Sequence, residues 1–268
     1  MKLYNTTDSQ YQPKIHLLVY GDGGVGKTTF ASTAPRPVMA DCEGGTKYFG
    51  LRGISMDVAR IEMWSDIQEF YATVKGGDYE TIVIDPLNEL MEKLMAHMRE
   101  QKNSKLVQRD GNPTMAGWGW LKQTMRQLLK SFRDIDKHLI LITHVSEDKD
   151  EEHLLKRPAM MTKLAQEVVN MVDIVAYMRM VKDENGAAKR ILMVQPESDR
   201  YVAKDRTGRL GEIIEPNFEH IVAGVRGNRQ FAWLKKLEKS QEEAMDRFNA
   251  DLERTAEELD AKQAQLVK

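Results

Sequence analysis

Short, almost wholly apolar runs alternate with longer amphipathic stretches between residues 15 and 171. The apolar runs are bounded by turn residues and lie at 15–20, 37–41, 81–85 and 138–144. Runs of this kind are typical of strands buried on both faces of a parallel sheet. The amphipathic stretches predict helices at 27–33, 65–75, 88–101, 119–134 and 161–171. The alternation predicts an α/β fold with a mostly parallel central sheet and right-handed crossovers.

The pattern changes after the last of these helices. Two further apolar stretches, 172–181 and 189–197, flank a polar segment that contains Asn185 and Gly186. This dipeptide is typical of a tight hairpin turn, so the two stretches predict an antiparallel pair of strands. A third stretch, 201–208, can add another strand. We therefore expect the parallel core to end in an antiparallel extension.

Both ends of the chain differ in composition from this core. Residues 1–13 are polar and predict a flexible arm, residues 14–233 form the predicted core domain, and the charged residues 234–268 predict a long helix. Apolar side chains recur at every seventh position of that helix, at Met245, Leu252, Leu259 and Leu266. The stripe favours a helix that docks one face on the core over a coiled coil, because Thr255 and Lys262 interrupt the second apolar position.

Composition and charge narrow the class of protein. The 268 residues include 39 Lys and Arg against 41 Asp and Glu, and the net charge of −2 excludes a strongly basic nucleic-acid coat. The single cysteine, Cys42, excludes a disulfide framework and a cysteine-rich zinc site. No apolar run approaches the roughly 20 residues that span a bilayer, and the N-terminus lacks the apolar core of a signal peptide. We therefore expect a soluble intracellular protein with no membrane partner.

The segment GDGGVGKTT follows the first predicted strand and matches the phosphate-loop pattern G-x-x-x-x-G-K-[ST]. Glycines let backbone amides turn toward an anion, and the helix that follows adds the partial positive charge of its N-terminus. Lys27 would reach the β- and γ-phosphates of ATP, and the Thr28 hydroxyl would bind Mg²⁺. A chance glycine-rich turn is the alternative, which the position between a strand and a helix disfavours. The predicted nucleotide-binding residues are Gly21, Asp22, Gly23, Gly24, Val25, Gly26, Lys27, Thr28 and Thr29.

Asp85 ends the buried run TIVID and is the second predicted magnesium ligand. A carboxylate at the tip of a strand beside the phosphate loop can hold Mg²⁺ through water. Apolar runs that end in Asp are common, so the prediction depends on the phosphate loop. The next residue is Pro86 rather than a glutamate. A water-activating base must therefore come from another strand.

Glu43 is the predicted base. It follows the apolar run 37–41 in the segment DCEGG, and the C-terminal ends of parallel strands converge on the phosphate site. Glu43 would then stand near the γ-phosphate, where a carboxylate can orient and deprotonate a water. The alternative is that Asp41 and Glu43 are a loop pair that only ends the strand.

The segments GDGGVGKTTFA, MADCEGG, TIVID and LITH, in this order and spacing, resemble the core of the RecA family. The phrases DCEGGTKYF and GWGWLKQTMRQLL are similar to the short phage ATPases that consist of a RecA-like core alone, the core-only class of Sak single-strand annealing proteins. The resemblance covers roughly residues 15–225. It implies a RecA-like P-loop NTPase core with ATP and Mg²⁺ as cofactors, and Glu43 as the residue that activates the water.

Three further site residues follow only from this resemblance. In RecA-like proteins the strand that ends here in LITH ends in a polar residue that senses the γ-phosphate, which implies that role for His144. The alternative is a histidine that only caps the strand. In DnaB-type helicases and RecA filaments a Lys-x-Arg on a late strand reaches the γ-phosphate of a neighbouring subunit. The resemblance implies such action in trans for Lys204 and Arg206, against the alternative of two solvated charges at a hairpin edge.

The resemblance implies that two predicted loops lie where RecA-like proteins hold single-stranded DNA. The first, 102–118, combines cations with tryptophans, as a groove that tracks the backbone and stacks bases would need. At least one of Trp118 and Trp120 is expected in the core. The second, 145–163, begins acidic and turns basic, which argues against a simple DNA groove. The predicted DNA contacts are Lys102, Lys105, Arg109, Trp118, Lys156, Arg157 and Lys163.

The sequence thus favours an ATP-dependent recombinase or annealing protein that binds single-stranded DNA and assembles with copies of itself as a ring or filament. The resemblance also admits a single-strand DNA-binding protein as a partner and the cytoplasm of a bacterial host as the location. A DnaB-like helicase motor and a nucleotide-gated scaffold without enzymatic activity remain alternatives. A partitioning ATPase is disfavoured by Asp22, where that class has lysine.

Overall fold

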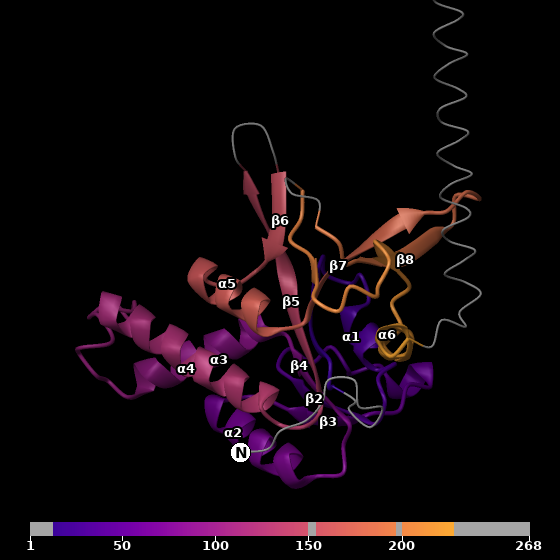
Figure 1. The fold of residues 1–268 in the computed structure, drawn as a ribbon. Coiled ribbons are helices and arrows are strands. Elements are labelled where there is room, and N and C mark those ends of the chain that lie inside the picture. Colours follow the sequence, from indigo (N-terminus) through magenta and orange to yellow (C-terminus); the bar gives the residue numbers. More distant parts are fainter. Residues whose placement is uncertain (1–12, 150–153, 197–199, 228–268) are drawn as a thin grey trace, which may run out of the picture. The chain divides into compact units, whose positions relative to one another are not determined.

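The apolar runs of the sequence form one mixed, mostly parallel sheet with helices on both of its faces (Figure 1). The computed structural model describes residues 13–149, 154–196 and 200–227. The helix predicted over 234–268, and all but the last residue of the predicted N-terminal arm, lie outside the described residues.

The parallel part of the sheet contains all four predicted core strands. Its members are β1 (His16–Gly21), β2 (Pro37–Asp41), β3 (Asp57–Arg60), β4 (Thr81–Asp85), β5 (His138–Lys149) and β7 (Ile174–Lys182). The order across the sheet is β7-β1-β5-β4-β2-β3. Strand β5 therefore separates β1, which leads into the phosphate loop, from β4, which ends in Asp85. This arrangement confirms the predicted α/β fold with a mostly parallel central sheet.

Helices bury both faces of these strands, which explains why the runs are apolar throughout. Alternate residues enter separate layers: Leu18 and Tyr20 belong to the larger core cluster, whereas Leu17 is buried on the opposite face. The larger layer is covered by α2 (Trp64–Gly76), α3 (Leu87–Glu100), α4 (Met115–Arg133) and α5 (Thr162–Met171).

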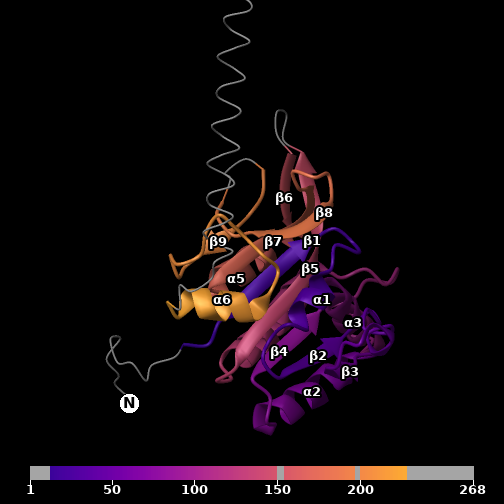
Figure 2. The ribbon, with the colours of Figure 1, turned by 90° about the vertical axis from the view of Figure 1, so that its right-hand side faces the viewer.

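The opposite face of the sheet is covered by α1 (Lys27–Ala31) and α6 (Phe218–Val225), which lie to the right of the sheet in Figure 1. The rings of Phe30 and Phe218 lie 6.3 Å apart between these two helices. Figure 2 views the molecule from this side, with α6 toward the viewer. Helix α1 thus begins at the edge of the sheet and is held by a second helix.

The antiparallel extension follows β7 as predicted. Strand β8 (Ala188–Met193) pairs with β7 as a hairpin, β10 (Ile213–Ile214) pairs with β8, and β9 (Lys204–Asp205) pairs with the first residues of β7. The connection of the hairpin is longer than the tight turn expected from Asn185-Gly186 and spans 183–187. The Asp183 carboxylate accepts hydrogen bonds from the amides of Asn185 and Ala187, which stabilises the longer loop.

Strand β6 (Leu154–Pro158) corrects the prediction of a loop over 145–163. Strand β5 continues past the sheet to Lys149 and pairs with β6 in an antiparallel hairpin. Only one end of the hairpin packs against the core, so most of the segment is charged. Its strands therefore lack the apolar pattern that predicts a buried strand. Helix α6 and the edge strand β3, which is mostly exposed, are also absent from the predicted pattern.

Candidate active site

Four neighbouring strands end at one edge of the sheet, and each leads into or carries part of the predicted nucleotide site. Gly21 of β1 lies opposite His144 of β5, and Asp41 of β2 lies opposite Asp85 of β4. Since β5 and β4 are also neighbours, the four residues follow one another across the sheet. Parallel pairing thus brings together segments that are far apart in sequence.

A cavity of about 430 Å³ lies at these strand ends. It is shared by most of the phosphate loop, both predicted magnesium ligands, the predicted base and the predicted sensor. Its lining consists of Gly23, Gly24, Gly26, Lys27, Thr28, Thr29, Glu43, Gly44, Gly45, Phe49, Arg52, Asp85 and His144. Gly21, Asp22 and Val25 belong to the same loop but do not line the cavity. The volume is within the usual range for small-molecule sites.

The phosphate loop needs glycine at its two ends for different reasons. Gly26, the residue before α1, has φ of 103°, a left-handed conformation that side chains rarely adopt. A side chain at Gly21 would collide with the carbonyl oxygen of Met178 in β7. The tight turn between them lets the loop run directly from β1 into the first turn of α1, whose amides can bind an anion.

Lys27 is held in place by the loop itself. Its Nζ donates to the carbonyl oxygens of Gly21 and Asp22, both at 2.8 Å, and the residue is buried. Burial lowers the pKa of Lys27, and the carboxylates of Asp85, Asp22 and Glu43 act in the opposite direction. The ammonium group therefore occupies a fixed position in the cavity before any ligand contact is made.

Thr28 and Asp85 fit the predicted magnesium site. The Thr28 hydroxyl hydrogen-bonds to the Asp85 carboxylate, so two oxygen ligands lie side by side in the cavity. Mg²⁺ commonly takes few protein ligands and fills its other positions with water and phosphate oxygens. In the described part of the chain no cluster of three or more His, Cys, Asp or Glu residues could hold a metal, so phosphate oxygens would be needed here. Burial raises the pKa of Asp85 to about 6, opposed by Thr28 and Lys27, and a bound cation would favour the charged form.

Asp41 organises the segment that carries Glu43. Its buried carboxylate accepts hydrogen bonds from the amides of residues 43–46 and from the Thr46 hydroxyl, at 2.6–3.2 Å. Burial alone would raise the pKa of Asp41, but these hydrogen bonds outweigh it and hold the pKa below its ordinary value. Asp41 therefore stabilises the loop, whereas the Glu43 carboxylate lines the cavity.

Glu43 and His144 lie side by side in the lining of the cavity. Glu43 Oε2 lies 3.6 Å from His144 Nε2, and the two side chains are 54% and 35% exposed. Both can therefore reach a ligand or a water. The structure places Glu43 in the same cavity as Lys27 and Asp85, and its role as the water-activating base stays a prediction.

Comparison with known proteins supports the same class of site. A family model described as an AAA domain matches residues 13–207. The chain belongs to this AAA-domain family. The matched region contains every residue of the cavity. The match and the cavity together support a nucleotide-binding P-loop ATPase.

The other comparisons give no further information on the function of this AAA domain. Among solved structures, a KaiC-like protein from the hyperthermophilic archaeon Pyrococcus horikoshii OT3 matches with a TM-score of 0.37 and 15% identity, over 71% of this chain and 82% of that chain. The comparison with curated proteins gives no match. None of the helices in the described residues has the length and apolar character to cross a membrane.

Lys204 lies outside the cavity of the AAA domain. Strand β9 pairs with the first residues of β7, at the end of the sheet opposite the phosphate loop. Lys204 Nζ donates to the carbonyl oxygens of Val169 and Val172, both at 2.6 Å, where α5 ends. Burial lowers the pKa of Lys204. Within its own subunit Lys204 therefore acts as a helix cap.

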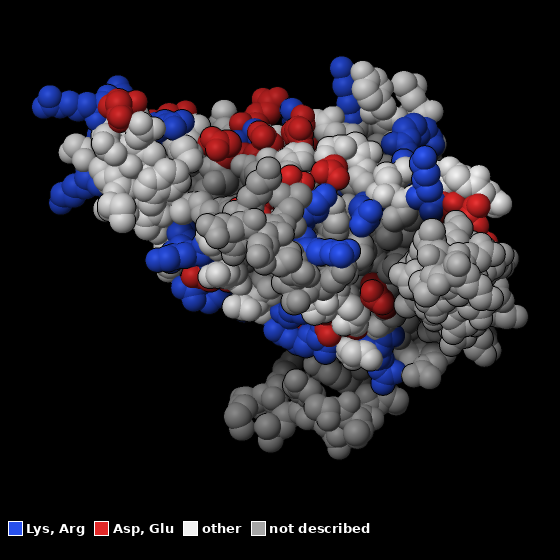
Figure 3. All heavy atoms as spheres, turned by 90° about the horizontal axis from the view of Figure 1, so that it is seen from above, with Lys and Arg blue, Asp and Glu red and all other residues white. Residues whose placement is uncertain are grey.

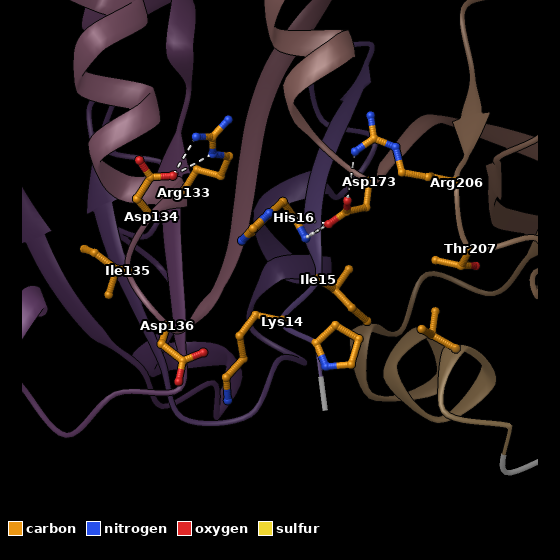
Figure 4. A pocket seen from close by; sticks show the side chains of 12 residues that line it. Lys14, Ile15, His16, Arg133, Asp134, Ile135, Asp136, Asp173, Arg206 and Thr207 are labelled. Atoms are coloured by element: carbon orange, nitrogen blue, oxygen red, sulfur yellow. Dashed lines mark hydrogen bonds and ion pairs between the residues drawn. The ribbon is translucent and has the colours of Figure 1, made fainter. Parts of the chain in front are cut away.

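Arg206 lies beside Lys204 and is 56% exposed. Its guanidinium contacts the Asp173 carboxylate at 3.4 Å and donates to the carbonyl oxygen of Asn170 at 3.0 Å. Figure 4 shows Asp173 between Arg206 and His16, whose backbone amide donates to the same carboxylate. Action of Lys204 and Arg206 on a neighbouring subunit stays a prediction, and the structure keeps both away from the cavity of their own chain.

The cations of the β5–β6 hairpin are paired with its acidic residues. Lys156 lies 3.5 Å from Glu147 and over the ring of Tyr177, and Arg157 lies 2.6 Å from Asp148. Figure 3 shows basic and acidic side chains intermingled on the face seen from above, with no continuous basic band. Pairing lowers the positive potential that these cations can offer to DNA. Lys163, on the first turn of α5, is exposed.

The first predicted DNA segment is a loop only up to residue 114. The Thr114 hydroxyl accepts from the Gly117 amide at 3.0 Å and starts α4 at Met115, four residues before the predicted helix. Trp118 is 38% exposed on α4, whereas Trp120 packs against the core. The loop that carries Lys102, Lys105 and Arg109 connects α3 to α4 at the outer end of this helix pair, away from the hairpin (Figure 1).

The sequence pattern did not predict two arginines that contact the nucleotide site. Arg190 of β8 donates from Nε to the carbonyl oxygen of Val25 in the phosphate loop, at 2.9 Å. Arg52, from the segment after β2, lines the cavity itself. No sequence signal marks either one, because β8 reaches the loop through the sheet and Arg52 reaches it through a folded loop.

Proposed function

We propose that this AAA domain is an ATP-dependent annealing or recombination protein that binds single-stranded DNA and couples ATP hydrolysis to assembly with copies of itself. The observation that carries the ATPase part is the shared cavity of the phosphate loop, Asp85, Glu43 and His144. Phosphoryl transfer to water needs positioned phosphates, positive charge around them and an oriented nucleophile. The cavity offers residues for all three.

Each of these residues would have one task. Lys27 would bind the β- and γ-phosphates from the position that its two carbonyl contacts define. Thr28 and Asp85 would hold Mg²⁺. When bound, this ion would neutralise negative charge on the phosphates. Glu43 would orient the attacking water and accept its proton. His144, 3.6 Å from Glu43, would hydrogen-bond to the γ-phosphate.

Support for single-stranded DNA comes from the residues around the start of α4. Lys102, Lys105 and Arg109 are exposed before this helix. Trp118 borders an apolar cavity of about 390 Å³ that is lined mainly by methionine and leucine, and an exposed indole can stack on a base. The net charge of −2 predicts modest, salt-sensitive affinity for one subunit. Assembly of several subunits would raise the affinity.

ATP turnover measured with and without single-stranded DNA tests the proposal. We expect turnover that DNA stimulates, annealing of complementary strands, and a shift to high mass on a sizing column when ATP and DNA are both present. Lys27→Ala should abolish nucleotide binding or hydrolysis. Directional unwinding would instead favour the helicase motor, and nucleotide binding without turnover would favour the scaffold.

A further inference from the structure

The segment after β2 brings a second cation into the nucleotide cavity. Arg52 lines the cavity together with Lys27 and Glu43. Its guanidinium lies over the ring of Phe49, 5.9 Å from the centroid, and Phe49 is buried. Stacking on a buried ring orients a guanidinium and leaves its N–H groups available to an acceptor.

The backbone on both sides of Arg52 is fixed by hydrogen bonds. Asp41 holds residues 43–46, as described above, and a 3₁₀ turn follows at Gly50–Arg52. The amides of Arg52 and Ile54 both donate to the Phe49 carbonyl oxygen, at 2.9 and 3.0 Å. The segment therefore presents Arg52 to the cavity from a defined position.

The partner that the structure gives to Arg52 is weak. Arg52 Nη1 donates to Thr29 Oγ1 at 3.3 Å, and no ion pair with another described residue accompanies this contact. A bond to a neutral hydroxyl contributes less than a charge-assisted, bidentate bond to a phosphate. An anionic ligand can therefore replace Thr29 at low cost.

The charge of the cavity favours such an exchange. Glu43 and Asp85 bring carboxylates into the lining, and a nucleoside triphosphate would add several negative charges. Lys27 and Arg52 are the Lys and Arg side chains of the lining. A triphosphate beside two carboxylates is more stable with both cations than with Lys27 alone.

We propose that Arg52 binds the polyphosphate of the nucleotide in its own subunit and exchanges the Thr29 hydroxyl for phosphate oxygens. The inference rests on the proposed function and adds a phosphate-binding residue to it. Because Arg52 and Lys27 belong to the same chain, this contact needs no neighbouring subunit. It differs in this respect from the action in trans predicted for Arg206.

Calorimetric titration with MgATP and with inorganic tripolyphosphate tests the proposal. Arg52→Ala should weaken both ligands by about 10- to 100-fold, the worth of a charge-assisted hydrogen bond, and Arg52→Lys should recover part of the loss. The matched control is Lys47→Ala, which removes an exposed cation of the same segment that does not line the cavity. Its affinities should equal those of the wild type. Circular dichroism checks that each variant is folded.

Three outcomes would overturn this proposal while the proposed ATPase stands. Unchanged affinity of Arg52→Ala for tripolyphosphate, while Lys27→Ala has lost it, would exclude the phosphate contact and leave the proposed ATPase intact. If Arg52→Ala lost affinity for MgATP but not for tripolyphosphate, Arg52 would contact the nucleoside instead of the phosphates. Recovery of turnover on mixing Arg52→Ala with Lys27→Ala subunits would show that Arg52 acts on a neighbour. If the wild type binds no ATP, the proposed function fails first and this inference fails with it.

Discussion

Asp41 and Glu43 are two residues apart and have different tasks. Asp41 is buried and accepts hydrogen bonds from the backbone amides of the loop at 43–46, whereas Glu43 is half exposed in the cavity. A carboxylate that accepts several amide hydrogens is held in its charged form and is unavailable as a base. Of the pair, Glu43 alone is placed to take a proton from water.

Glu43→Gln should keep nucleotide affinity and slow hydrolysis by about 10²- to 10⁴-fold, the usual contribution of a positioned base. The amide preserves size and hydrogen bonding but cannot accept the proton. Steady-state phosphate release and a separate binding titration measure the two effects. Unchanged turnover would transfer the role of base to another carboxylate.

Asp85→Asn should change stability in a pH-dependent way. Burial raises the pKa of Asp85 to about 6 from an ordinary 3.8, so the folded chain binds this proton more tightly than the unfolded chain. The contribution of Asp85 to the free energy of unfolding therefore becomes more favourable as the pH falls from above 6 to below 4. Without ligand, the asparagine variant should be up to about 3 kcal/mol more stable at pH 8, and the gain should shrink toward pH 4.

Urea denaturation of wild type and Asp85→Asn across this pH range measures the difference. The same variant should lose magnesium-dependent turnover, because a neutral amide is a poorer ligand for the cation. A stability difference that is constant with pH would show that Asp85 ionises normally.

At the scale of the elements, β9 secures the end of α5. Two carbonyl oxygens there accept from Lys204 at 2.6 Å, and a cation at a helix C-terminus is also favoured by the helix dipole. Lys204→Met should therefore lower the free energy of unfolding by about 1–3 kcal/mol. Chemical denaturation measures the loss, with Lys47→Ala as a control for removal of an exposed cation. Full stability with abolished turnover would instead favour the role in trans.

Strand β5 links the active site to the hairpin. The Ala159 amide, just after β6, donates to the His144 carbonyl oxygen at 2.9 Å, and the Thr143 hydroxyl donates to the Ala159 carbonyl oxygen at 3.1 Å. Ala159 also lines the apolar cavity that Trp118 borders. A shift of His144 would therefore move Ala159, which lines the cavity beside the surface proposed for DNA.

At the scale of the whole molecule, the cavity and Arg206 lie at opposite ends of the sheet. A residue that acts on a neighbour must lie away from the site of its own chain, as Arg206 does. Arg206→Ala alone should lose turnover, and mixing it with Lys27→Ala subunits should restore part of it, because each supplies half of one interface. Turnover of mixtures at several ratios measures the effect. No recovery at any ratio would argue against action in trans.

The sequence by itself determined the parallel core, the phosphate loop and the meeting of Lys27, Glu43 and Asp85. These features depend on local patterns: apolar runs of strand length, glycines before a helix, and carboxylates at strand ends, which parallel pairing then aligns. Tertiary structure alone decided that Asp41 holds the loop, that Lys204 caps α5, that acidic neighbours pair with the hairpin cations, and that Arg52 enters the cavity. Each of these contacts joins a side chain to a partner that the folded backbone brings near, and no spacing along the chain records such a distance.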